Sequence, residues 1–195
     1  MTRVYRYVHV SDDGRAPCSD NGLLSLATCK PAIRRTAQPG DWVMGFYPAP
    51  APAGVLGWAA RVSKVLDHGD YEQAFRGRAD AVYRRDASGH MKRLRVDYHP
   101  TEEEMARDLS GPVLLFDKRS SWYFGDSPVS LPSHFQHLAA RGQGHRVNGV
   151  LLSDPDCLEA WLREIGKPGL HGRPRHAEDP CGACGSPDQP RQPTC

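Results

Sequence analysis

Two proline positions limit the length of the first helix that this chain can form. Pro31 suits the first turn of a helix, where its missing N–H is not needed, and Pro39-Gly40 requires a turn soon afterwards. The sequence therefore predicts a short helix from Pro31 to about Ala37. Alternating side chains predict a strand on either side of this helix, in residues 3–10 and 41–47.

Strand patterns outnumber helical patterns in the rest of the first 166 residues. Further strands are predicted at residues 55–67, 79–86, 92–99 and 112–125, and a turn at 86–89 joins the middle two into a hairpin. Short helices are predicted at residues 100–109 and 131–142, and a short helical turn or a loop at residues 69–75. These elements predict an α+β fold, with a small curved β-sheet or open β-barrel and helices packed on its ends.

The clearest predicted helix is amphipathic and lies at residues 153–166. Its apolar stripe consists of Leu158, Trp161, Leu162 and Ile165. Ser153 and Asp156 resemble a capping box, and Gly166 ends the helix. We expect this C-terminal helix to dock on the core through its stripe.

The composition changes after Gly166 and sets the domain boundaries. Residues 1–166 are predicted to form a single globular domain, and the Pro/Gly-rich residues 167–195 a disordered tail. Cys181 and Cys184 in that tail have the CxxC spacing, but zinc needs four ligands in structural sites. We expect no metal and no cofactor.

The net charge argues against a protein that wraps duplex DNA, and the lack of an export signal argues for reduced cysteines. The formal net charge is only +2, whereas proteins that wrap duplex DNA carry a much larger basic excess. A free nucleotide or a single base remains a suitable ligand. The N-terminal residues show no signal-peptide or membrane-helix pattern, so we expect a cytoplasmic protein with reduced thiols.

Residues 29–34 are the first candidate site. Cys29 would lie at a helix N-terminus beside Lys30, which stabilises a thiolate, but small buried cysteines are common and we expect it to pack. Lys30 precedes a proline, so its backbone is expected to be extended. Lys30 and Arg34 could bind a phosphate, with a base against Trp42; the alternative is a solvated helix face.

Other polar and aromatic residues are weaker candidates. Asp80 and His145 join Cys29 as possible catalytic groups, although a strand end and a solvated loop are the simpler interpretations. Three consecutive aromatic residues at 122–124 cannot all face one side of a strand, so one of them could stack on a base. The predicted ligand-binding residues are Lys30, Arg34, Trp42, Arg78, Asp80, Tyr83, Tyr123 and Phe124.

Several short motifs together resemble the nucleotide modification associated domain, type two, over roughly residues 4 to 152. They are Ala27-Thr28-Cys29-Lys30-Pro31, Ile33-Arg34, Gly40-Asp41-Trp42-Val43, Gly45, Arg78-Ala79-Asp80, Tyr83 and Tyr123-Phe124-Gly125. Ala81 stands where the family often has an asparagine. The order of elements also looks like PUA-like barrels of the ASCH and EVE type, an analogy of fold alone.

The resemblance implies a role in nucleotide or DNA base modification. We therefore expect binding of a nucleotide, or of a flipped or modified base, in a cleft that includes residues 29–34, Trp42 and Tyr123-Phe124. One alternative is an enzyme that installs, processes or removes a base modification. A second is a non-catalytic accessory subunit that contacts DNA-modification proteins.

Overall fold

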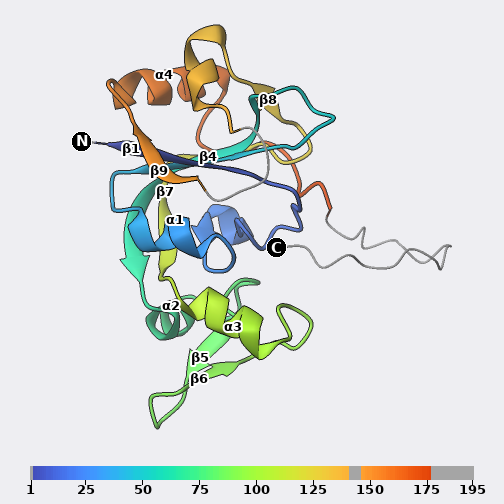
Figure 1. Cartoon of the computed structure of the whole chain (residues 1–195), viewed down its shortest axis with the longest axis vertical. Helices are drawn as coiled ribbons and strands as arrows, with labels where there is room; N and C mark the ends of the chain where they lie inside the picture. The colour runs from blue at the N-terminus through green and yellow to red at the C-terminus, as the bar shows by residue number, and fades with distance from the viewer. Residues whose placement is uncertain (1, 141–145, 177–195) are drawn as a thin grey trace, which may run out of the picture.

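A computed structural model describes residues 2–140 and 146–176, and most of its strands join one large mixed sheet (Figure 1). The strands of this sheet are β1 (Arg3–Val8), β2 (Ser25–Leu26), β3 (Trp42–Phe46), β4 (Val55–Leu66), β7 (Val113–Tyr123), β8 (Val129–Ser130), β9 (Arg146–Leu151) and β10 (Gly169–Leu170). Their main order is β10-β7-β4-β3-β1-β9, with β2 on β7 and β8 on β4. The predicted α+β class is confirmed, but the sheet is not closed into a barrel and a PUA-like architecture is not confirmed.

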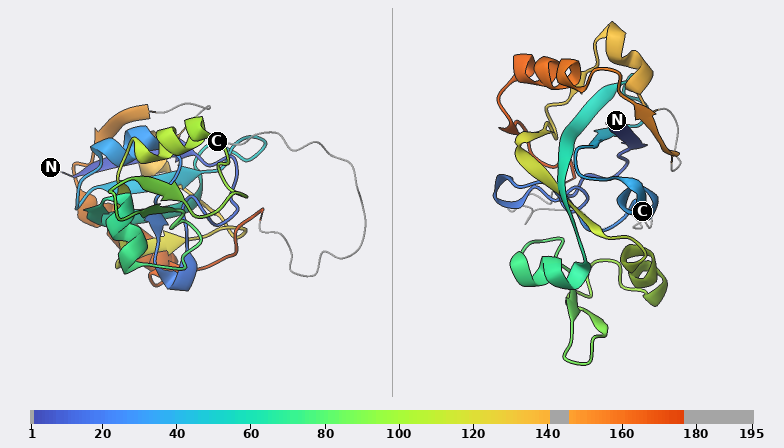
Figure 2. Two further views of the ribbon diagram at one scale, coloured as in Figure 1. Left: turned by 90° about the horizontal axis from the view of Figure 1, so that it is seen from below. Right: turned by 90° about the vertical axis from the view of Figure 1, so that its left-hand side faces the viewer.

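The helices of the described residues lie on the two faces of this sheet or in the segment between β4 and β7. They are η1 (Asp20–Gly22), α1 (Pro31–Thr36), α2 (His68–Ala74), α3 (Glu102–Leu109), η2 (Ser133–Leu138) and α4 (Pro155–Ile165). The α4 and η2 helices pack on one face, and α1 packs on the other (Figure 2). The short first helix and the C-terminal amphipathic helix were both predicted, although Asp154 and not Ser153 caps α4.

Alternation along β3 explains how one strand serves both faces. Trp42, Met44 and Phe46 pack with Leu158 and Leu162 of α4 in one apolar cluster, as the pattern predicts. Val43 points the other way and packs with Ile33 of α1 in the second cluster. Four strands escaped prediction, namely β2, β8, β9 and β10; three of them contain only two residues.

Residues 67–112 leave the sheet between β4 and β7 and form a lobe of their own. This lobe holds α2, α3 and the predicted hairpin, which is shortened to β5 (Tyr83–Arg85) and β6 (Met91–Arg93). In Figure 1 the lobe lies below the sheet, with α3 beneath α1. Segments far apart in the sequence therefore meet where the lobe joins the main body.

The predicted tail is ordered over its first residues. Instead of starting a disordered segment at 167, the chain forms β10, which pairs in parallel with β7. The backbone of Arg173 then passes close to Gly125. A Cβ atom added at Gly125 would lie 2.1 Å from the carbonyl oxygen of Arg173. Backbone pairing with the core compensates for the scarcity of apolar side chains in residues 169–176. Cys181 and Cys184 lie outside the described residues.

Candidate functional site

The N-terminal end of α1 brings Cys29 against residues of the lobe. Cys29 Sγ lies 3.7 Å from Nε2 of His99, which is 70 positions away in the sequence. The other ring nitrogen of His99, Nδ1, lies 2.6 Å from Oδ2 of Asp108. A thiol, an imidazole and a carboxylate thus form one chain of contacts, the arrangement that activates cysteine nucleophiles. Cys29 is half-buried and not enclosed in the core. The expectation that it serves only for packing stays a prediction.

Asp108 is the fixed end of this chain of contacts. It lies in the last turn of α3, is buried, and accepts hydrogen bonds from the backbone N–H of Cys29 at 2.9 Å and the hydroxyl of Tyr83 at 2.8 Å. Burial alone raises the pKa of this carboxyl, but the hydrogen bonds, with that from His99 the strongest, lower it below its ordinary value. Asp108 is therefore a carboxylate that orients both Cys29 and His99.

The environment of His99 favours its protonated form. Burial by itself lowers the pKa of His99, but the contacts with Asp108 and Cys29 outweigh burial and raise the pKa from 6.5 to about 10. A protonated imidazole between a carboxylate and a thiol stabilises the thiolate and can later donate its proton. The charge on His99 is thus placed where it would stabilise a negative charge on the Cys29 sulfur.

The raised pKa of His99 predicts a pH-dependent stability. Because the folded state binds this proton more tightly than the unfolded state, the stabilisation is complete below about pH 6.5 and is lost as pH rises through about 10. The free energy of unfolding should therefore exceed that of His99→Asn by an amount that shrinks between these values. Denaturant titrations of both proteins at several pH values measure this difference. A difference that does not change with pH would contradict the assigned pairing.

The backbone at Cys29 and Lys30 is strained. Their φ angles are 55° and 42°, in the left-handed region that non-glycine residues rarely occupy. The expected extended conformation of Lys30 is therefore wrong. Tertiary contacts override the local preference, since Asp108 holds the Cys29 N–H and Arg34 Nε donates to the Cys29 carbonyl at 2.7 Å. Strain of this kind is concentrated at functional sites.

Arg34 holds the backbone around Cys29 and Asp108 in place through buried hydrogen bonds. Its side chain is fully buried and donates to the carbonyl oxygens of Cys29, Asp108, Gly111 and Pro112 at 2.7–2.8 Å. These bonds tie α1 to the end of α3 and the start of β7. In this structure the buried guanidinium is used by the chain's own carbonyls.

Lys30 is the predicted ligand residue that stays accessible beside Cys29. Its side chain is half-buried, and its Nζ lies 4.9 Å from the ring centroid of Tyr7. It forms no ion pair with a carboxylate among the residues that the structure describes. An ammonium group next to Cys29 is therefore available for an anionic group of a ligand.

Two other predicted site residues, Arg78 and Asp80, belong to a buried network of hydrogen bonds. Asp80 and Arg78 are buried as an ion pair at 3.4 Å, and Asp80 accepts hydrogen bonds from Ser25 Oγ at 2.6 Å and Tyr71 OH at 2.7 Å. Burial raises the pKa of Asp80, and its hydrogen bonds oppose that effect. This network joins β2 to the lobe and is separate from the Cys29 contacts.

The predicted aromatic platforms are also buried. Trp42 is inaccessible and stacks on Trp122 with ring centroids 6.2 Å apart, while Phe124 belongs to the same core cluster. The hydroxyl of Tyr123 donates to buried Asp12, which also accepts from Tyr47 at 2.9 Å. These rings offer no face to a base in this structure.

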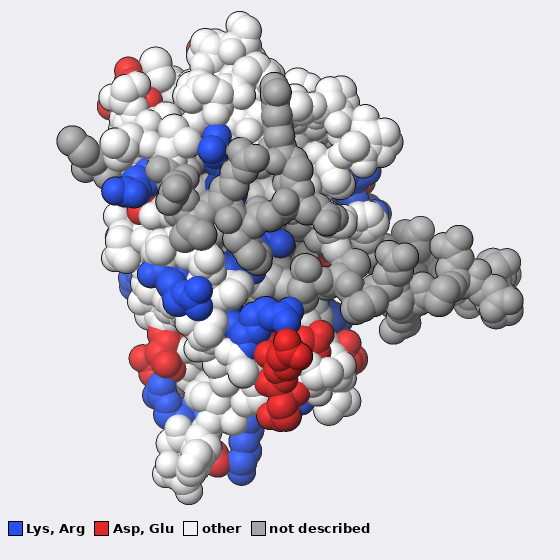
Figure 3. All heavy atoms as spheres, viewed as in Figure 1, with Lys and Arg blue, Asp and Glu red and all other residues white. Residues whose placement is uncertain are grey.

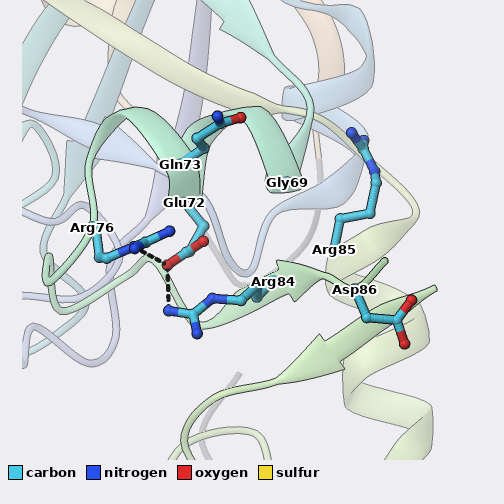
Figure 4. A pocket seen from close by; sticks show the side chains of 7 residues that line it. All are labelled: Gly69, Glu72, Gln73, Arg76, Arg84, Arg85 and Asp86. Atoms are coloured by element: carbon cyan, nitrogen blue, oxygen red, sulfur yellow. Dashed lines mark hydrogen bonds and ion pairs between the residues drawn. The ribbon is translucent and has the colours of Figure 1, made fainter. Parts of the chain in front are cut away.

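A polar hollow lies away from Cys29, and its buried carboxylate is already paired. A hollow of about 260 Å³ lies between α2 and β5, where Glu72 accepts from Arg76 at 3.1 Å and Arg84 at 2.7 Å (Figure 4). Acidic side chains gather over the first turn of α3, and basic ones are scattered over the face that carries α1 (Figure 3). Within residues 2–140 and 146–176, no cluster of histidine, cysteine and acidic residues could hold a metal ion.

Comparison with known families gives a match for the N-terminal part of the chain. Residues 1–80 match the model of nucleotide modification associated domain 2. The resemblance identified from the sequence motifs is thus confirmed over these residues. The part that matches nucleotide modification associated domain 2 includes Cys29, Lys30 and Arg34, whereas His99 and Asp108 lie beyond it. The family name links the chain to nucleotide modification. Curated proteins and solved structures gave no match.

Sequence reasoning named Cys29, Lys30 and Tyr83 but missed His99 and Asp108. Tyr98-His99 precedes a proline and an acidic helix, a context without a recognised spacing to any cysteine. The other predicted base, His145, lies outside the described residues. No helix in the described parts of the chain is long and apolar enough to cross a membrane.

Proposed function

We propose that this protein is a cysteine-dependent enzyme that transfers or hydrolyses an acyl group carried by a nucleotide or a nucleic-acid base. The observation that carries this proposal is the continuous contact from Cys29 Sγ through His99 to Asp108. The match to nucleotide modification associated domain 2 supports a nucleotide context. The proposal corresponds to the enzyme alternative derived from the sequence, with a reader or accessory subunit as its competitors.

The proposed reaction begins with Cys29 as its thiolate and with the proton already on His99. The thiolate attacks the carbonyl carbon of an amide or ester, so that an S–C bond forms and the C=O π electrons move onto oxygen. When the tetrahedral adduct collapses, the C–N or C–O bond breaks and the leaving atom takes the proton from His99. Water or an amine then attacks the thioester carbonyl and gives a proton to the now neutral His99. The C–S bond breaks, the acyl group leaves as a carboxylic acid or an amide, and the Cys29 thiolate beside protonated His99 is restored.

The protonated state of His99 favours acyl transfer over simple binding. An acyl substrate has a leaving nitrogen or oxygen that needs a proton, and His99 holds one up to about pH 10. Asp108 keeps the proton-bearing ring in place through Nδ1. A protein that only holds a base would not require this pair of groups at a half-buried thiol.

Lys30 is proposed to bind the phosphate of the substrate. It follows the nucleophile directly in the chain, and the described residues provide no carboxylate to neutralise it. A single ammonium group suits a terminal phosphate, which needs charge and no particular geometry. Loss of this contact should weaken binding of a phosphorylated substrate by about tenfold or more.

The test uses N4-acetyl-2′-deoxycytidine 5′-monophosphate as a probe. Wild type should release acetate and, when quenched early, carry one acetyl group on Cys29, whereas Cys29→Ser should be at least about a thousandfold slower. The matched control is Cys157→Ser, because Cys157 is exposed and remote from the site in the sequence. Intact-protein and peptide mass spectrometry measure the adduct.

The same probe separates the enzyme from a reader. Lys30→Ala should raise KM for the monophosphate and leave KM for the unphosphorylated nucleoside unchanged. Binding of the probe by wild type and Cys29→Ser with equal affinity, with no acetyl transfer in either protein, would contradict the enzyme proposal. That result would favour the binding function predicted from the sequence.

A further inference from the structure

The hydroxyl of Tyr98 lies beside the sulfur of Cys29. It is 3.9 Å from Cys29 Sγ and 3.1 Å from Oγ1 of buried Thr28. The Cys29 sulfur therefore has the imidazole of His99 on one contact and a phenol on another. Neither the family description nor the contact from Cys29 to Asp108 gives this phenol a role.

The ring of Tyr98 is held in place by its neighbours. It stacks on the imidazole of His99 with centroids 4.1 Å apart and planes inclined by 13°. The guanidinium of Arg15 lies over the Tyr98 ring at 4.7 Å and also pairs with Asp97 at 3.3 Å. The loop that follows β1 and the segment that carries His99 thus fix the direction of the hydroxyl.

The protonation state of Tyr98 makes it a donor. Burial raises the pKa of Tyr98 well above its ordinary value of 10, and the charge of Cys29 adds to that effect. The phenol therefore keeps its proton across the physiological range. Thr28 Oγ1 can donate to the Tyr98 oxygen, which leaves the phenolic proton for another acceptor.

We infer that Tyr98 donates a hydrogen bond to the oxyanion that forms when Cys29 attacks an acyl group. This inference rests on the proposed function. In that step the Cys29 sulfur bonds to the carbonyl carbon, and the C=O π electrons become a lone pair on oxygen. The carbonyl oxygen is attached to the carbon that Sγ binds, so a hydroxyl 3.9 Å from Sγ is within reach of it. No proton leaves Tyr98; its O–H bond only turns from its resting partners to the oxyanion.

The rates at which Cys29 reacts with two electrophiles distinguish stabilisation of an oxyanion by Tyr98 from an effect of Tyr98 on the reactivity of the thiol itself. Acetylation by p-nitrophenyl acetate passes through an oxyanion, whereas alkylation by iodoacetamide displaces iodide and forms none. Tyr98→Phe keeps the ring stack and removes only the hydroxyl. We expect this variant to slow acetylation of Cys29 by roughly tenfold or more relative to alkylation, as expected for a lost hydrogen bond to a charged group.

The matched control is Tyr5→Phe, which removes another buried hydroxyl, bonded at 3.2 Å to the carbonyl of Thr36. It should leave both rates unchanged, and melting curves confirm that each variant is folded. Two results would overturn the role of Tyr98: Tyr98→Phe slows both reactions equally, or it slows neither. If wild-type Cys29 is still rapidly alkylated in that experiment, the proposed function is unaffected. Slow alkylation of Cys29 in wild type would overturn both.

Discussion

Replacing Arg34 with methionine is expected to lower the free energy of unfolding by about 3 to 5 kcal/mol. Methionine fills similar space but donates no hydrogen bond, so the carbonyls of Cys29, Asp108, Gly111 and Pro112 lose the guanidinium. A buried carbonyl without a partner costs about 1 to 3 kcal/mol, and nearby His68, with Nε2 3.0 Å from the Gly111 oxygen, compensates only part of the loss.

Arg35→Met is the matched control for Arg34→Met. Arg35 lies on the same helix but is exposed, and its described hydrogen bond reaches Ser110 Oγ at 3.2 Å on the surface. Its replacement should change stability by no more than about 0.5 kcal/mol. Urea titrations of the two variants and wild type measure the difference. Equal stabilities for the two variants would show that the buried guanidinium contributes far less than its contacts indicate.

Asp108→Asn is expected to slow acetyl transfer from the nucleotide probe by about a thousandfold to ten-thousandfold, as for the corresponding change in other nucleophile–histidine–carboxylate sites. The amide has one acceptor atom for the three donors that Asp108 now binds, on Cys29, His99 and Tyr83. It also cannot stabilise a protonated imidazole by charge. Single-turnover acetylation of Cys29 measures the effect.

Binding separates loss of chemistry from loss of the fold in Asp108→Asn. The variant should still bind the unreactive 2′-deoxycytidine 5′-monophosphate through Lys30 with affinity close to that of wild type. Acetylation at the wild-type rate would contradict the role of the carboxylate. If both binding and the melting transition disappear, Asp108→Glu, which keeps the charge, should restore the fold and a measurable part of the rate.

Local patterns were sufficient to predict much of the secondary structure. Proline placement fixed the start of α1, and alternation in β3 gave the inward face of Trp42, Met44 and Phe46. The strands β2, β8 and β10 have two residues each, too few for a period to show. Residues 167–176 were predicted to be part of a disordered tail because their contacts are made mainly by the backbone. Backbone contacts cannot be recognised from amino-acid composition.

The candidate site was less predictable because it joins distant segments. Cys29 meets His99 and Asp108 across 70 and 79 positions, and no local pattern indicates that the lobe folds back on α1. The position of Arg34 was predicted wrongly for a related reason. A basic residue on a short helix is typical of the surface, yet Arg34 points inward and donates hydrogen bonds to four backbone carbonyls. Lys30 adopts a left-handed backbone only because these contacts hold it.

The reactivity of Cys29 tests the central claim most directly. Limiting iodoacetamide at pH 7, followed by peptide mass spectrometry, gives the alkylation rates of Cys29 and exposed Cys157 in one sample. We predict that Cys29 reacts at least about tenfold faster than Cys157, and that His99→Asn removes this advantage without changing the rate at Cys157. Alkylation of Cys29 no faster than that of Cys157, or unaffected by His99→Asn, would contradict a nucleophile activated by His99 and Asp108.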